Sequence, residues 1–210
     1  MGRWADDAPG RLRAAALDLF SERGYEATTV ADVAARAGLS ERTFFRHFPD
    51  KREVLFDGSR ALEAEVTAAV GACGASSALG AALTGLAAGA TALEGAVGLE
   101  RARVRARLVT STAELREREQ MKRAELSDAV ARSLAARGCP PGEAALAAGL
   151  AVVTFESAFA AWVGGDGTRG LAEELVRATG ALAALVATAT PAPPPEPGPA
   201  PPGPLGTMAP

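Results

Sequence analysis

The stretch TTVADVAARAGLSERTFFRHFPDK, residues 28–51, decides the fold, and it holds the only histidine of the 210-residue chain. Thr29 can cap a helix through its hydroxyl, with Asp32 three residues on as its capping-box partner. Gly38 supplies the positive φ that a tight turn between helices needs. Ser40 caps the next helix, which a proline then ends. The stretch therefore predicts two short helices joined by a turn.

Helical periodicity continues on both sides of this stretch. Apolar residues recur at i, i+3, i+4, i+7 and i+8 over residues 11–23, which predicts a preceding helix. A fourth helix is predicted over residues 51–70. Further helices are predicted over residues 77–93, 100–109, 113–137, 142–163 and 168–188. The sequence contains no convincing run of alternating β-branched residues, so we expect an all-α fold.

Charge and cysteine usage narrow the function classes. The net charge of -3 does not by itself indicate a protein that binds polyanions. Residues 36–52, however, carry five basic and two acidic side chains, and this basic excess falls inside the opening stretch. Cys73 and Cys139 are too few for a disulfide framework or a zinc cluster. The polar, acidic N-terminus does not resemble a secretory signal, so we expect a cytoplasmic protein.

The most apolar window, residues 144–163, is interrupted by Glu156. About a dozen uncharged residues precede this carboxylate, which is short of the ~20 that a membrane-spanning helix needs. We therefore expect no membrane partner.

Two short helices around a glycine turn match a helix-turn-helix, in which the second helix enters the major groove of DNA. Arg42 is the candidate for a bidentate contact to a guanine edge. Thr43 is placed to contact a thymine methyl group or a phosphate. Thr29, at a helix start, offers its hydroxyl and nearby N–H groups to a phosphate.

The segment ALDLFSERGYEATTVADVAARAGLSERTFFRHFPDKREVLF resembles the DNA-binding region of TetR-type (TetR/AcrR) transcriptional regulators. The likeness covers about residues 11–56 and includes the turn glycine, the aromatic-x-His-aromatic segment and the lysine that opens the next helix. It implies that His47 and Lys51 contact the DNA backbone. For His47, packing between Phe45 and Phe48 is the alternative.

One residue departs from the family pattern, because Phe45 stands where tyrosine is common and cannot donate a hydrogen bond to phosphate. We expect Phe45 to pack on the sugar-phosphate surface, or Arg46 to supply the lost anchor. The candidate DNA-binding residues are Thr29, Ser40, Glu41, Arg42, Thr43, Phe45, Arg46, His47 and Lys51.

The predicted organisation has four parts. These are a flexible arm (residues 1–10), the helix-turn-helix domain (11–56), a helical ligand-binding and dimerisation domain (57–188) and a disordered Pro-rich tail (189–210). Ten of the last twenty residues are proline. The helices predicted over 142–163 and 168–188 are apolar on all sides, which favours pairing with a second subunit. The alternative is that they fold back on their own core.

The resemblance also implies a pocket for a small effector among the middle helices. Candidate lining residues are Phe56, Leu83, Leu86, Leu108, Met121, Phe155, Phe159 and Trp162. For each of these residues, a place in the plain core is a better explanation than a ligand contact. Ionisable candidates are few inside this region, so we expect an apolar effector, and we expect neither a cofactor nor a metal.

An enzyme would need activated groups, and the sequence offers few. It contains no Gly-rich phosphate loop, no zinc spacing and no nucleophile with a visible base. The rival interpretation is a helical ligand-binding or protein-interaction module that does not bind DNA. We favour a non-enzymatic, homodimeric bacterial regulator, a repressor that binds a near-palindromic double-stranded DNA operator.

Overall fold

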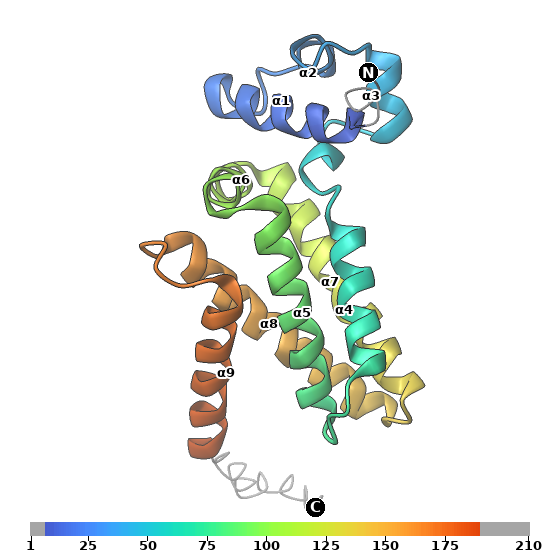
Figure 1. The fold of residues 1–210 in the computed structure, drawn as a ribbon, viewed down its shortest axis with the longest axis vertical. Coiled ribbons are helices and arrows are strands. Elements are labelled where there is room, and N and C mark those ends of the chain that lie inside the picture. Colours follow the sequence, from blue (N-terminus) through green and yellow to red (C-terminus); the bar gives the residue numbers. More distant parts are fainter. Residues whose placement is uncertain (1–6, 190–210) are drawn as a thin grey trace, which may run out of the picture.

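The computed structural model describes residues 7–189, which form nine α-helices and one 3₁₀ turn and no β-strand (Figure 1). The elements are α1 (Ala8–Arg23), α2 (Val30–Arg36), α3 (Glu41–His47), η1 (Glu53–Leu55), α4 (Ser59–Ala72), α5 (Ala78–Val97), α6 (Leu99–Ser111), α7 (Ala113–Ala136), α8 (Pro141–Gly164) and α9 (Leu171–Thr188). The predicted all-α fold is confirmed. The Pro-rich tail from residue 190 and residues 1–6 of the predicted arm lie outside the described residues.

The first helix begins earlier than the periodicity predicts. The side chain of Asp7 accepts a hydrogen bond from the Gly10 N–H at 3.1 Å, and Pro9 occupies the first turn, where its missing N–H costs nothing. Residues 8–10 are therefore helical, and the prediction that they belong to a flexible arm is wrong.

The single helix predicted over residues 51–70 is also wrong, because the chain forms η1, turns, and then begins α4. Asp50 accepts hydrogen bonds from the N–H groups of Arg52 and Glu53 and starts the 3₁₀ turn. Phe56 is buried at 3% exposure among the N-terminal helices, whereas α4 packs in the other half of the molecule. The chain has to turn between these two environments, and periodicity cannot show this.

The N-terminal helices and η1 form a head that surrounds an aromatic core. This head cluster comprises Leu12, Ala15, Ala16, Leu19, Phe20, Tyr25, Val33, Ala37, Phe44, Phe48, Val54, Phe56, Val109 and Leu115. Val109 of α6 and Leu115 of α7 belong to the following helices. The head therefore completes its core with residues from beyond position 56, and Figure 1 shows α6 lying beneath α1.

The remaining helices form a body with a second core, made mainly of Ala, Leu and Val. In this body α4 packs on α5 and α7, and α8 packs on α5, α7 and α9. Close approach of α4 and α5 depends on Gly85, where an added Cβ would lie 2.8 Å from the Val66 carbonyl oxygen. Small side chains thus allow helices to fill the body core at short distance.

Arginines of the body hold the chain segment that links it to the head. Arg105 of α6 donates to the Leu55 carbonyl at 2.9 Å and to the Glu119 carboxylate at 2.6 Å. Arg118 of α7 pairs with Glu53 of η1, and both side chains are largely buried. The charged segment at the start of α7 is therefore more than the solvated face that its sequence indicates.

Two helices, Ala78–Val97 and Pro141–Gly164, are long and apolar enough to cross a membrane by length and composition. The sequence argument that Glu156 leaves the window of α8 too short is therefore wrong. Both helices nevertheless pack against several others, and Glu156 forms an ion pair with Arg123 of α7 at 3.2 Å. Their apolar character is accounted for by the body core.

Tyr25, the chain's single tyrosine, reports on packing of the head. Burial raises the pKa of its phenol, and the Glu114 carboxylate adds to the rise. The pKa of Tyr25 in the folded protein exceeds the unfolded value of about 10. Its phenol therefore stabilises the fold fully below about pH 10, and this contribution is lost as the pH rises from there through the folded pKa. We predict that phenolate absorbance appears at higher pH in native than in urea-unfolded protein. Identical titration curves in the two states would contradict the burial of Tyr25.

Candidate nucleic-acid interface

The caps that the sequence predicts are present at the starts of α2 and α3, and the predicted glycine turn lies between the two helices. The Thr29 hydroxyl accepts a hydrogen bond from the Asp32 N–H, and the Asp32 carboxylate accepts from the Thr29 N–H at 2.9 Å, which completes the capping box. Ser40 accepts from the Thr43 N–H at 3.2 Å and starts α3. Gly38 has a φ of 64°, as its place in the turn requires.

Helix α3 divides into a buried face and an exposed face. Phe44 and Phe48 are 0% and 1% exposed and pack in the head cluster. Glu41, Arg42, Phe45 and Arg46 are exposed to solvent. Phe45 has 53% of its surface accessible, and its ring packs edge-on against Phe44 at 5.5 Å. The exposed face of α3 thus combines charged residues with one uncovered aromatic ring.

Ser40 and Thr43 are less available than the sequence suggests. Their hydroxyl oxygens lie 3.0 Å apart and hydrogen-bond to each other in the first turn of α3. Glu41 occupies that same turn, where a carboxylate interacts favourably with the helix dipole. In the free protein these three residues therefore stabilise the start of the helix.

The fold divides the arginines of residues 36–52 into those that form ion pairs and those that do not. Arg36 forms a bidentate pair with Glu22 of α1, and Arg52 pairs with Asp50 and with Glu114 of α7. Within residues 7–189, by contrast, Arg42 and Arg46 form no ion pair. The uncompensated positive charge of the stretch therefore gathers on the exposed face of α3.

His47 lies at the last turn of α3 and is half-buried. Its ring centroid is 6.3 Å from that of Phe48, and its Nε2 is 3.4 Å from a guanidinium nitrogen of Arg46. The ring thus packs beside one aromatic residue while part of it stays accessible. Both roles considered for His47, packing and phosphate contact, are compatible with this position.

Two predicted phosphate ligands already donate hydrogen bonds to groups of the head itself. The Thr29 hydroxyl donates to the Asp32 carboxylate at 2.6 Å, and hydrogen bonds from Thr29 lower the pKa of that carboxyl. The Lys51 ammonium donates to the backbone carbonyls of Tyr25 and Thr28. Lys51 precedes a 3₁₀ turn rather than opening the α-helix that the sequence predicts over residues 51–70.

The candidate effector residues do not gather in one cavity. Phe56 and Leu108 belong to or pack on the head cluster, and Met121 on α7 is 50% exposed. The other five, on α5 and α8, belong to or pack on the body core: Leu83, Leu86, Phe155, Phe159 and Trp162. These five fill space between helices rather than line an opening.

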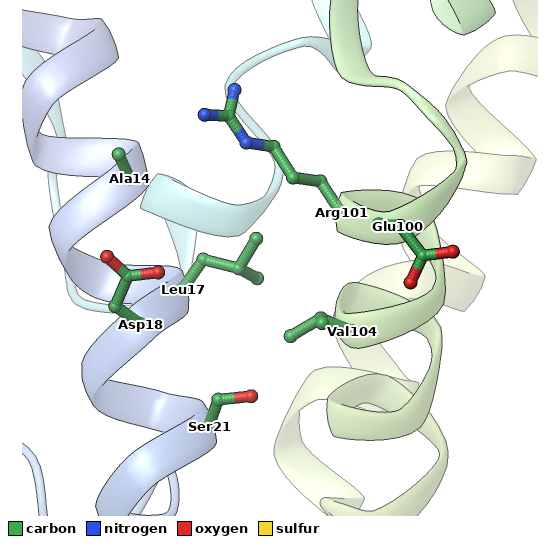
Figure 2. A pocket seen from close by; sticks show the side chains of 7 residues that line it. All are labelled: Ala14, Leu17, Asp18, Ser21, Glu100, Arg101 and Val104. Atoms are coloured by element: carbon green, nitrogen blue, oxygen red, sulfur yellow. The ribbon is translucent and has the colours of Figure 1, made fainter.

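The hollows found on the described residues lie elsewhere. A groove of about 190 Å³ separates α1 from α6, and in Figure 2 Leu17 and Val104 point toward each other across it. A second, of about 270 Å³, lies between the α4–α5 loop and the α7–α8 loop. None of the eight candidate effector residues borders either hollow.

Sequence reasoning missed the arginines that hold the interface together. Arg11 of α1 donates to the carbonyl of Ala37, the residue that ends α2. Arg105 and Arg118 perform a similar role at η1. Their sequence positions carry no distinguishing signal, because their partners are distant in the chain.

Known proteins share this local sequence. The profile described as bacterial regulatory proteins, tetR family, matches residues 12–57. The HTH-type transcriptional regulator TcmR of Streptomyces glaucescens is 44% identical over 55 residues, which are 26% of this chain and 24% of TcmR. The chain thus matches about a quarter of that relative's length.

Solved structures share the arrangement of nearly the whole chain. A complex of SmeT with triclosan has a TM-score of 0.59 at 20% identity, and the match covers 90% of this chain and 99% of that one. FadR from Bacillus subtilis, solved with stearoyl-CoA, has a TM-score of 0.52 at 19% identity over 82% and 96% of the two chains. At these identities the likeness concerns the fold.

A helix-turn-helix head with a basic α3, joined to a larger helical body, is an arrangement found in DNA-binding transcriptional regulators. The head carries the sequence signature of one group of such regulators, and the body has the matching fold. The chain thus resembles TetR-family regulators in the sequence of its head and in its overall fold.

The capping box can be tested through stability. Thr29→Ala removes the hydroxyl that both donates to and accepts from Asp32, so we predict a loss of about 1 kcal/mol in the free energy of unfolding. Urea denaturation followed by circular dichroism measures this loss. Thr84→Ala is the control, because Thr84 is exposed within α5 and bonds only to the carbonyl one turn back. An equal effect of the two substitutions would show that the box contributes nothing.

Proposed function

We propose that the chain is a sequence-specific regulator that inserts α3 into the major groove of double-stranded DNA. The observation that carries the proposal is the exposed face of α3, where Arg42 and Arg46 have no acidic partner in the described chain. Unpaired arginines on a helix that a packed core holds in place suit contacts to base edges and phosphates.

We assign separate roles to the residues of this face. Arg42 in the first turn of α3 is the base reader, because the N-terminal residues of a recognition helix reach base edges. Arg46 and His47 in the last turn are phosphate contacts. Phe45, which cannot donate a hydrogen bond, packs on the DNA surface between them.

Substitution of the two arginines separates these roles. We predict that Arg42→Ala lowers the ratio of two affinities, that for DNA from upstream of the protein's own gene and that for scrambled DNA. Arg46→Ala should weaken binding to both DNAs about equally, because phosphates carry no sequence information. Fluorescence anisotropy with the purified protein at one fixed salt concentration measures both effects.

The control is Arg132→Ala, which removes an exposed arginine near the end of α7 that is remote from the head. It should leave both affinities unchanged. If wild type binds neither DNA at low salt, the chain is not a DNA-binding regulator. In that case the helical module without DNA binding becomes the better account.

We further propose a homodimer formed through α8 and α9. Large apolar side chains stand exposed on these two helices, and they are Leu146, Val153, Val176, Leu185 and Val186, each with at least 60% of its surface accessible. Several large apolar side chains left exposed on two helices favour an interface there. Twofold pairing would present two copies of α3 to a near-palindromic operator.

Charge placed on this surface should disrupt the dimer. We predict that Val153→Glu combined with Leu185→Glu gives a monomer by light scattering after size exclusion, because the carboxylates would be buried without partners. Met121→Glu is the matched control, since Met121 is an exposed apolar residue on α7. A dimeric double variant would exclude α8 and α9 as the interface.

We propose that operator binding represses transcription and that a small apolar effector relieves it. The neighbours SmeT and FadR, solved with triclosan and stearoyl-CoA, support an apolar ligand. The proposed pocket lies among the five residues of α5 and α8 that fill the body core, and it would have to open when the effector binds. The effector acts only if it binds the two states of the dimer with different affinity.

The free thiols of Cys73 and Cys139 support a cytoplasmic location.

A further inference from the structure

Lys51 lies in the turn between α3 and η1, where its ammonium group faces the loop between α1 and α2. Its Nζ donates to the Tyr25 carbonyl at 2.9 Å and to the Thr28 carbonyl at 3.1 Å. The same nitrogen lies 3.9 Å from the centroid of the Tyr25 ring. Two of the three ammonium donors are thus engaged, and the cation also rests on an aromatic face.

The loop that receives Lys51 is itself fixed. Tyr25 is 4% exposed and packs edge-on against Phe20 at 5.1 Å. Thr28 is 1% exposed, and its hydroxyl donates to the Gly24 carbonyl at 2.9 Å. Both carbonyl oxygens therefore accept from the same ammonium group, and the fixed loop restricts the motion of the Lys51 side chain.

The contacts of Lys51 with the Tyr25 and Thr28 carbonyls, called the tie below, join the two ends of the helix-turn-helix. Residues 25 and 51 enclose α2, the turn and α3, and the two helices have seven residues each. Helices this short do not hold their place through their own hydrogen bonds. A charged contact that closes this segment onto the loop between α1 and α2 limits how far α3 can shift relative to the rest of the head.

We propose that Lys51 is a positioning residue that holds α3 in its DNA-binding orientation, rather than the phosphate anchor that the family resemblance implies. The inference rests on the proposed DNA binding. Arg42 and Arg46 then supply the charge that meets the DNA. Lys51 acts through them, because its own charge is directed into the head.

The salt dependence of binding separates the two roles. Each lysine that neutralises a phosphate contributes about one to the slope of log affinity against log salt concentration. We expect Lys51→Met, in the full chain, to lower affinity for the upstream DNA about tenfold and to leave the slope unchanged. Arg46→Met is the matched comparison and should reduce the slope by about one.

A double-mutant cycle adds a result that a purely stabilising residue would not give. If Lys51 places α3, the affinity lost through Arg42→Ala should be smaller in the Lys51→Met background than in wild type. A slope reduced by about one in Lys51→Met, together with an unchanged effect of Arg42→Ala, would overturn the proposal and make Lys51 a phosphate contact.

Hydrogen exchange of the free protein tests the tie without DNA. We expect faster amide exchange over residues 25–37 in Lys51→Met than in wild type, with α8 and α9 unchanged. Equal exchange over residues 25–37 would overturn the tie. Because this measurement needs no DNA, a failure of wild type to bind DNA would refute the proposed function without deciding the structural role of Lys51.

Discussion

Burial of the aromatic rings in the head is the constraint on which the rest of the structure depends. Helices of seven residues are not stable in isolation, so α2 and α3 persist because Phe44 and Phe48 pack against Leu19 and Phe20 of α1. Val109 and Leu115 of the body complete this core. The head is consequently built against α6 and α7, and a movement of those helices would reach α3 through packed side chains.

The same packing determines which charges remain for the proposed DNA contact. Arg36, Lys51 and Arg52 turn toward the head and its junction with the body, where carboxylates or carbonyls receive them. Arg42 and Arg46 point away from the core because Phe44 and Phe48 fix the rotation of α3. A chain with a net charge of -3 thereby presents a basic recognition face.

Local signals in the sequence were sufficient for part of this arrangement. The Thr29 capping box, the Ser40 cap, the Gly38 turn and the buried side of α3 follow from residues within one turn of each other, and the structure confirms them. The contact of Arg105 with η1 and the engagement of Lys51 depend on partners at least twenty residues away. Side-chain type alone also could not show that the candidate effector residues of α5 and α8 fill the space between these helices rather than line a pocket.

The body explains why the proposed effector would have to act by rearrangement. Its helices approach closely through small residues, as at Gly85, and Arg103 of α6 further ties the end of α8 by donating to the Val163 carbonyl at 3.0 Å. Because α6 also holds Leu55 through Arg105, one helix contacts both the proposed dimer helices and the segment below the head. Separation of α5 and α8 by a ligand would therefore act on both.

The central claim is that two copies of this chain read DNA through α3. Selection of bound duplexes from a random DNA pool by the full-length protein, at one fixed salt concentration, tests it most directly. The account predicts enrichment of an inverted repeat whose half-sites lie about one helical turn apart. Recovery of a pool with no enriched sequence, or of a single unrepeated site, would contradict it.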